Sequence, residues 1–586
     1  MADETITART IADRHLDQVA AHDPLHAAWL GLHPGDDRQP DLSPEGFEAL
    51  ADIARRTLTA LDATHPAADL TAVADAAGAD AAGDHKTALT AAATATDPAD
   101  RTCARLLRER LTAELAVHDS GENFRQLRNI AAHVHHVRDI FSYMPTATDD
   151  DWAAVAGRMR NLPAALDGYR ATLTEGMSRR LLVAPRQAAA VVDQLTAWTG
   201  EDTGNAGWFA GFVAPGPERL RGELDAAALR ATAATAEFRD WLRDTYAPAT
   251  VGTPDAVGRE RYRLAVRHHT GAEVDLDEAY AWAWSEFHRT AAEMRAAADR
   301  VLPGAGALEA MRHLERHGHA IEGEEAVRDW LQQIMDGAIT ALDGTHFDIS
   351  GPLRRVESRI APAGSAASPY YSGPSLDFSR PGRTYFPTLG RDSFPTWQLV
   401  SIWYHEGVPG HHLQLAQWVA LADELSRYQT TLGMVSANVE GWALYAERLM
   451  DELGFLDDPA HRLGFLDEQM LRTIRVIIDI GMHLDLAVPA DAGFHPGERW
   501  TPELATEFMA TYNGSPAELR DSEIVRYLGW PGQAIGYKLG ERAWLRGRDA
   551  ARSRLGAGFD LKTWHMKALA LGSLGLDDLA DRLAAL

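Results

Sequence analysis

Apolar residues recur three and four positions apart along most of the chain, which is the spacing of one face of an α-helix. Breaks between these stretches contain Pro-Gly turn sequences, as at 34–35, 215–216 and 303–304. The sequence therefore predicts a mainly α-helical protein. The predicted helices cover residues 44–62, 99–117, 150–181, 186–198, 219–245, 276–301, 325–342, 395–420, 423–452, 462–485 and 532–555.

Two regions depart from this pattern. Residues 346–395 are rich in Pro, Gly, Ser and aromatic residues, and the short runs 355–360 and 384–386 predict a small β element. Residues 66–98 hold few large apolar side chains, so we expect a weakly ordered surface segment there. The absence of a sequence repeat disfavours a solenoid, and the absence of a Gly-rich phosphate loop disfavours a nucleotide-binding fold. We therefore expect residues 1–586 to form a single helical unit. In this unit the β element lies beside a cleft.

Composition narrows the range of partners. The 586 residues include 57 Lys and Arg against 84 Asp and Glu, a net charge of −27, and 46% of them are hydrophobic, enough for a large core. Such a charge repels phosphate backbones and anionic lipids, so we expect no nucleic-acid or membrane partner. The chain has no long apolar run and no signal-like N-terminus, which favours a cytoplasmic location. The one cysteine, Cys103, excludes an intramolecular disulfide and a cysteine-based zinc cluster.

The candidate chemistry begins with His405-Glu406 and His411, within residues 396–455. In many zinc hydrolases two His on one helix face bind the metal, and the Glu after the first His is the general base. Those His lie four residues apart, whereas His405 and His411 lie six apart, about 120° from a common face on a regular helix. The pair can share a metal only if the helix is interrupted.

The intervening residues favour such an interruption. Gly407, Pro409 and Gly410 are residue types that break a helix or make it bulge. Looping out two residues brings His411 to the place of a second ligand. The alternative is a kinked core helix with one buried His and a surface Glu, and the spacing alone does not separate the two.

A third ligand is expected one helix further on. Glu440 precedes Gly441 and Trp442 in an otherwise apolar stretch, and a buried carboxylate there is costly unless it is paired or bound to metal. Glu447, seven residues later, lies on the same face and is a candidate partner for a ligand or a salt-bridge residue. The alternative for Glu440 is an ion pair with an arginine.

Taken together, these residues read His-Glu-x-x-Pro-Gly-His-x-x-Gln followed by Glu-Gly-Trp-Ala-x-Tyr-x-Glu. This pattern resembles the large bacterial family catalogued as domain of unknown function 885, whose members resemble helical zinc peptidases of the thimet oligopeptidase and angiotensin-converting enzyme type. The resemblance covers nearly the whole chain. It includes further motifs at 144–152, 168–170, 257–265, 370–377, 526–534 and 537–540.

The resemblance implies an elongated helical barrel with a deep internal cleft. It also implies one zinc ion per chain, bound by His405, His411 and Glu440, with Glu406 as general base. The family often has Phe-His-Asp near its C-terminus where this chain has Trp564-His565-Met566, which leaves a role for His565 in doubt.

Tyrosines are the remaining candidates. Hydrolysis through a tetrahedral intermediate needs a donor to the oxyanion, and Tyr537 is the first candidate, although it is as readily a core aromatic. Tyr370 and Tyr371 on the β element, and Tyr527, are candidates for contact with the substrate.

Three functions remain open at this stage. The first is a zinc-dependent hydrolase that cleaves a peptide or amide bond of a short peptide. The second is a hydrolase of a small-molecule amide or ester in a biosynthetic pathway. The third is a non-catalytic helical binding protein that keeps the fold. Glu406 beside His405 argues against the third, because a purely structural site needs no base.

Overall fold

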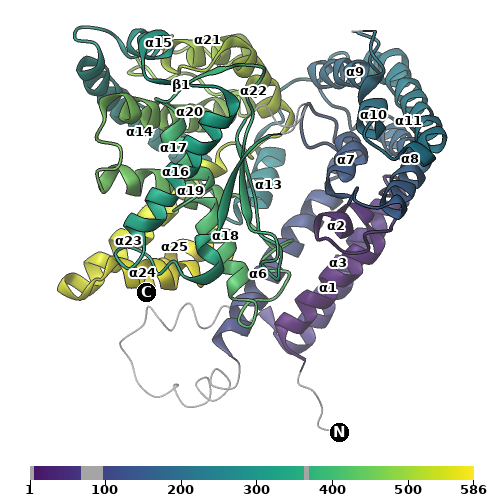
Figure 1. The fold of residues 1–586 in the computed structure, drawn as a ribbon, viewed down its shortest axis with the longest axis horizontal. Coiled ribbons are helices and arrows are strands. Elements are labelled where there is room, and N and C mark those ends of the chain that lie inside the picture. Colours follow the sequence, from purple (N-terminus) through teal and green to yellow (C-terminus); the bar gives the residue numbers. More distant parts are fainter. Residues whose placement is uncertain (1–5, 68–96, 203, 362–367) are drawn as a thin grey trace. The chain divides into compact units, whose positions relative to one another are not determined.

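The computed structural model describes residues 6–67, 97–202, 204–361 and 368–586. Helices dominate it, as the periodicity predicts, and strands are few and short (Figure 1). The segment expected to be weakly ordered, 66–98, lies almost wholly outside the described residues. Each helix among these residues is too short or too polar to cross a bilayer.

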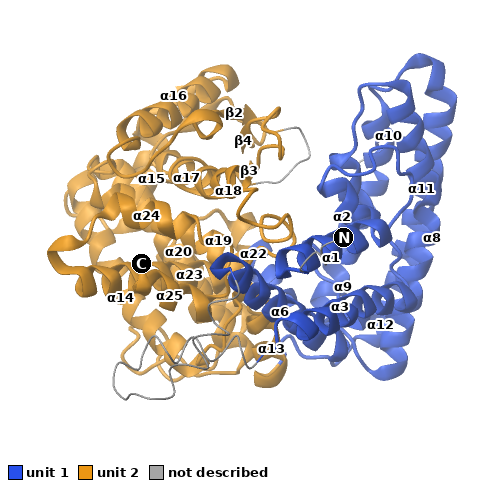
Figure 2. Ribbon diagram, turned by 90° about the horizontal axis from the view of Figure 1, so that it is seen from below, with its two compact units in different colours: residues 1–257, 522–530 blue, residues 258–521, 531–586 orange. Residues whose placement is uncertain are grey.

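The chain forms two compact units (Figure 2). Unit 1 comprises residues 1–257 and 522–530, and unit 2 comprises residues 258–521 and 531–586. This division differs from the single helical unit expected from the sequence. The chain passes between the units three times, in loops at 257–258 and 530–531 and inside the helix Ala517–Gly529 at 521–522.

Unit 1 is helical, and its core lies where α8 and α9 pack on α11. Thr148 starts α8 because its side chain accepts a hydrogen bond from the Asp151 backbone, while the Asp151 carboxylate accepts one from the Thr148 backbone. The helices of this unit, apart from the end of α22, are α1 Ala8–His22, α2 Pro24–Trp29, α3 Pro44–Thr64, α6 Pro98–Asp119, α7 His133–Asp139, α8 Asp149–Arg179, α9 Pro185–Thr199, α10 Gly207–Val213, α11 Arg221–Trp241 and α12 Ala247–Ala249. Shorter turns are η1 Glu122–Arg125, η2 Ile140–Tyr143, η3 Glu218–Leu220 and the π-turn η4 Leu242–Tyr246.

Unit 2 holds the remaining helices. Its long helices pack in pairs, α14 on α20 and α19 on α23, and α25 covers α23. Their bounds are α13 Arg259–Thr270, α14 Leu276–Val301, α15 Ala307–His317, α16 Glu324–Leu342, α17 Leu399–Glu406, α18 His411–Ala420, α19 Ser436–Glu452, α20 Pro459–His483, α21 Pro502–Tyr512, α22 Ala517–Gly529, α23 Gly536–Leu555, α24 Leu561–Leu569 and α25 Leu576–Ala585, with short turns η5 Gly351–Arg354 and η6 Gly556–Gly558. Helix α22 begins in unit 2 and ends in unit 1.

The predicted β element is present in unit 2. Strand β4 (Gly382–Phe386) lies between β2 (Val356–Ile360), which is parallel to it, and β3 (Tyr370–Ser372), which is antiparallel. Strand β5 (Ser393–Pro395) pairs with β1 (Ala320–Glu322), which the sequence pattern did not predict. Since β4 contacts α18, the three-stranded sheet flanks the helix that begins at His411.

Candidate metal centre

The predicted helix 395–420 is interrupted between Glu406 and His411. Helix α17 ends at Glu406 and α18 begins at His411. In the turn between them, Gly410 N donates to Tyr404 O (3.0 Å) and His412 N donates to Gly407 O (3.0 Å). The break required by the six-residue spacing is therefore present.

Two glycines allow the turn to be this tight. A Cβ atom at Gly410 would lie 2.0 Å from His405 O, and one at Gly407 would lie 1.9 Å from Cε of Met335 on α16. Real Cβ atoms do not approach other atoms this closely. At Gly410 the obstacle is backbone, which cannot rotate away, so the chain can return to start α18 only with glycine there.

The break brings three side chains together. His405 Nε2 lies 3.4 Å from Glu440 Oε2, and His411 Nε2 lies 3.6 Å from the same oxygen. The imidazole rings are 4.7 Å apart, nearly perpendicular. One potential ligand atom from each residue lies within 4.8 Å of the other two. Within the part of the chain that the structure describes, no other group of three or more His, Cys, Asp or Glu is arranged in this way.

Helix α19 supplies Glu440, and the two residues after it explain how the helix is placed. A Cβ at Gly441 would lie 2.4 Å from the Gly540 backbone, so this glycine lets α19 pack closely on α23. Trp442 Nε1 donates to the carbonyls of Pro409 (2.9 Å) and Gly410 (3.1 Å). The Glu-Gly-Trp sequence thus joins a candidate ligand to a side chain that holds the turn before His411.

Glu447 fixes His405 from the other side. Its Oε1 lies 2.7 Å from His405 Nδ1, and its Oε2 accepts a hydrogen bond from Ser401 Oγ (2.8 Å). Glu440 and Glu447 are seven residues apart on one face of α19, so one faces each ring nitrogen of His405. Because an ionised carboxylate only accepts, Nδ1 carries a hydrogen and Nε2 is the nitrogen directed at Glu440 and His411.

The electrostatics match this arrangement. Burial alone would lower the pKa of His405, but the Glu440 and Glu447 carboxylates raise it to about 10. Burial would likewise raise the pKa of Glu440, yet His405 and His411 hold it well below its usual value. The Glu440 side chain is 22% exposed, but its Oε2 atom is buried and has no hydrogen-bond partner among the described residues. His411 Nδ1 is likewise buried and has no hydrogen-bond partner among the described residues.

Glu406 adjoins the cluster from the end of α17. It is 8% exposed, and burial raises the pKa of its carboxyl. The charges of His405 and His411 lower this pKa in part, and the charge of Glu440 raises it. A carboxyl whose pKa is raised is a stronger base than an exposed one, which suits a group that must accept a proton.

The other predicted site residues are distributed differently. The Tyr537 ring, at the start of α23, lies under the Arg475 guanidinium at 4.8 Å. Burial lowers the pKa of Arg472, and the charges of Glu447, Tyr537 and Glu440 raise it in part. Tyr527 lies in unit 1, fully buried, with its hydroxyl on Glu523.

The β-element tyrosines have partners of their own. Tyr370 stacks on Tyr385 of β4, with ring centroids 4.8 Å apart. His412 Nε2 donates to Leu353 O (2.9 Å), so its Nδ1 accepts a hydrogen bond from Tyr371 Oη (3.0 Å). Tyr371 therefore directs its proton at the residue after His411.

Several of these contacts were not expected from the sequence. Ser401 precedes His405 by four residues, a helical spacing that could have indicated it. The bonds of Trp442 to the turn, and of Tyr371 to His412, join distant parts of the chain and leave no local signal. His565 is fully buried, with Nδ1 donating to His346 O (3.2 Å) and Nε2 accepting from Tyr445 Oη (2.7 Å). Both ring nitrogens are therefore engaged in hydrogen bonds within the protein.

Comparisons with known proteins place the whole chain. A solved structure from Colwellia psychrerythraea, described as that of a "putative lipoprotein", has a TM-score of 0.79 at 20% identity and covers 99% of each chain. One from Shewanella oneidensis, a protein of the same description and of unknown function, has a TM-score of 0.71 at 17% identity. It covers 99% of this chain and 100% of its own. At these identities the likeness concerns the fold alone.

No curated protein matches the chain. The family described as "Bacterial protein of unknown function (DUF885)" matches residues 24–583, nearly the whole length. The chain therefore belongs to the DUF885 family.

Proposed function

We propose that this protein is a zinc-dependent hydrolase that cleaves a peptide or amide bond in a short peptide. The observation that carries the proposal is the meeting of His405, His411 and Glu440, with the buried Glu440 Oε2 lacking a hydrogen-bond partner among the described residues. An acceptor in this position is costly unless a cation or a donor occupies the space before it.

The donor set suits zinc. Two imidazole nitrogens and one carboxylate oxygen form a common catalytic zinc set, which leaves one coordination position open to water or substrate. Carboxylate-rich oxygen sites suit magnesium and calcium, whereas imidazole favours zinc and its neighbours in the transition series. The Glu447–His405 bond is the outer-shell contact typical of such ligands.

The chain's own residues then have defined tasks. Zinc, when bound, polarises the substrate carbonyl and makes its water acidic, with a pKa of about 7. Glu406 takes the proton of the attacking water and delivers it to the departing amine nitrogen. Its pKa, raised by burial, suits both transfers. Glu447 keeps the His405 ring directed at the cluster, supported by Ser401.

Tyr537, at the start of α23 and under the Arg475 guanidinium, is the proposed donor to the developing oxyanion, since a tyrosine hydroxyl can donate to it. Tyr370, Tyr371 and Tyr527 have intramolecular partners in the present arrangement, so the proposal assigns them no contact with the reacting bond. The elongated barrel and cleft implied by the family resemblance would give a short peptide access to the cluster.

The test is a mixture of short peptides incubated with the zinc-loaded protein and analysed by mass spectrometry, with and without a chelator. We expect chelator-sensitive cleavage, about one zinc per chain, and loss of cleavage by several orders of magnitude in Glu406→Gln with zinc retained. The matched control is Glu452→Gln, an exposed acid on α19 paired with Arg548. Equal cleavage by Glu406→Gln would remove it as the base, and absence of zinc from the purified protein at equimolar supply would refute the proposal.

A further inference from the structure

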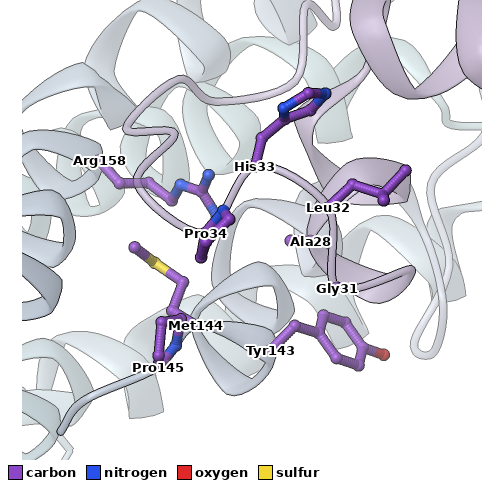
Figure 3. Close-up of a pocket in the computed structure, with 9 residues that line it drawn as sticks. All are labelled: Ala28, Gly31, Leu32, His33, Pro34, Tyr143, Met144, Pro145 and Arg158. Carbon is purple, nitrogen blue, oxygen red and sulfur yellow. The ribbon is translucent and has the colours of Figure 1, made fainter. Parts of the chain in front are cut away.

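Unit 1 contains a pocket far in sequence from the metal cluster, with a volume of about 320 Å³. It lies between the end of α2 with the loop that follows, the end of η2 with the next two residues, and α8 (Figure 3). Ligand pockets for small molecules begin at about this size. Its lining residues are Ala28, Gly31, Leu32, His33, Pro34, Tyr143, Met144, Pro145 and Arg158.

Arg158 is the one lining residue with a permanent charge. Its side chain extends from α8 toward Pro34 (Figure 3) and is 2% exposed. One nitrogen, Nη2, donates to the carbonyl of Asp36. The other two, Nε and Nη1, are buried and have no hydrogen-bond acceptor among the described residues. An unpaired donor on a buried cation is among the costlier groups a protein can hold.

The charges of two nearby acids, Asp36 and Asp37, raise the pKa of Arg158 in part. The Asp36 carboxylate is bound by Arg38, with Nη2 and Oδ2 2.6 Å apart. Within the described ranges, no carboxylate lies within ion-pair distance of Arg158. Burial lowers the pKa of Arg158 to about 10, which still leaves it charged at neutral pH. The pocket is therefore lined by a charged guanidinium that forms no ion pair among the described residues and has two N–H groups without an acceptor there.

The loop around the charge is held in place by side chains. Asn161, one turn after Arg158 on α8, donates to Asp37 O (2.9 Å). Gln39 Nε2 donates hydrogen bonds to the carbonyls of Val137 (3.3 Å) and Arg158 (3.4 Å). These bonds tie the loop to α8 and to α7, so the pocket is formed before any ligand enters. A pre-formed site avoids the cost of ordering on binding.

The rest of the lining is mostly apolar. Leu32, Pro34, Met144 and Pro145 form much of it, and Tyr143 beside them is 48% exposed. A bare inorganic anion would pair with the guanidinium but leave these side chains uncovered. We propose that this pocket binds a small organic carboxylate with an apolar body, whose carboxylate accepts hydrogen bonds from Arg158 and whose body covers the apolar lining.

The experiment compares N-acetyl-L-leucine with N-acetyl-L-leucinamide, in which a neutral carboxamide replaces the carboxylate on the same apolar body. Calorimetric titration uses the full chain carrying His405→Ala, so that the metal cluster cannot take the carboxylate. We expect the acid to bind at least about tenfold more tightly than the amide, a difference of about 1.4 kcal/mol. Equal affinities, or no binding of either, would overturn the proposal.

Variants then locate the binding. Arg158→Gln should abolish the preference for the acid, while Arg160→Gln, an exposed residue on the same helix paired with Glu223, should preserve it. Ala28→Leu fills the pocket without touching the charge, so it should weaken binding even if Arg158→Gln does not fold. Acid binding unaffected by Ala28→Leu would place the ligand elsewhere. Inorganic phosphate that binds as tightly as the acid would show that the apolar lining plays no part, and would also refute the proposal.

Discussion

At the scale of single residues, Glu447 is the clearest determinant of the proposed zinc affinity. It is 1% exposed and binds His405 Nδ1 at 2.7 Å. We expect Glu447→Gln to reduce zinc affinity by about 10- to 100-fold, because the amide no longer provides a charged acceptor that directs the ring. Competition with a fluorescent chelator measures this loss.

Ser401→Ala provides a graded comparison, since it removes only the hydrogen bond to Glu447 Oε2 and should have a smaller effect. Glu452→Gln, on the exposed side of α19, should leave zinc affinity unchanged. If Glu447→Gln binds zinc as tightly as the unmodified protein, the carboxylate does not position His405 in the way proposed.

His565 gives a prediction about pH. Burial lowers its pKa to about 3, against an ordinary value of 6.5, so the folded protein keeps the ring neutral where the unfolded chain protonates it. The stability it contributes is present above pH 6.5 and is lost as the pH falls toward 3. At pH 4.5 the loss is about 3 kcal/mol.

His565→Gln can make the same two hydrogen bonds without titrating. Urea unfolding with chelator present should therefore show the unmodified protein losing about 3 kcal/mol more than the variant between pH 7 and pH 4.5. Parallel losses in the two proteins would mean that His565 is protonated in the folded state.

The residues of the cluster could be predicted because their signals are local. His405 and Glu406 are adjacent, His411 follows a Gly-Pro-Gly break, and Glu440 is a carboxylate in an apolar stretch. The hydrogen-bond partners of the tyrosines could not be predicted, because they depend on which distant residue each hydroxyl meets. Tyr371 meets His412, 41 residues away, and no local pattern specifies that contact.

At the scale of elements, the break between α17 and α18 determines whether His405 and His411 can meet. Gly410→Ala would place a Cβ atom 2.0 Å from His405 O and 2.5 Å from Tyr404 O. Since these are backbone atoms, α18 must move and take His411 with it. We expect zinc affinity to fall by about tenfold or more, with about 1–3 kcal/mol of lost stability from overpacking.

The matched control is Gly337→Ala. Gly337 lies inside α16 of the same unit, and a Cβ there meets no atom within 4 Å. Alanine is the better helix former, so this variant should be unchanged or more stable by up to about 1 kcal/mol. Zinc titration and thermal unfolding of both variants compare them directly. Normal zinc binding by Gly410→Ala would show that the turn tolerates a side chain.

Several long periodic stretches predicted their helices closely, whereas local turns and short helices were not predicted. The predicted helices 44–62, 276–301 and 325–342 correspond closely to α3, α14 and α16. The predicted helix 423–452 begins only at Ser436, because the residues before it form turns closed by local bonds such as Ser426 with Gln429. Short helices such as α2 and α7 offer too few residues for a period to be recognised.

At the scale of the whole molecule, the two units are not contiguous in sequence. Residues 522–530 belong to unit 1, although they follow the start of unit 2 at Gly258 in the sequence. Within unit 1, Val525 O accepts from Gln187 (2.7 Å) and Arg128 lies over the Trp530 ring at 4.5 Å. A division made by returning segments has no compositional boundary, which explains why the sequence predicts one unit.

This division allows a last prediction, because all three candidate ligands belong to unit 2. Zinc that binds only the folded form should stabilise it by about 4 kcal/mol at a concentration 1,000 times its dissociation constant. Hydrogen exchange with and without zinc should show slower exchange in α17, α18 and α19, with the core of α8, α9 and α11 as an internal reference. His405→Ala should remove the difference. Protection confined to unit 1, or present equally in His405→Ala, would mean that zinc binds elsewhere, since neither the ligands nor the turn that positions them lies in that unit.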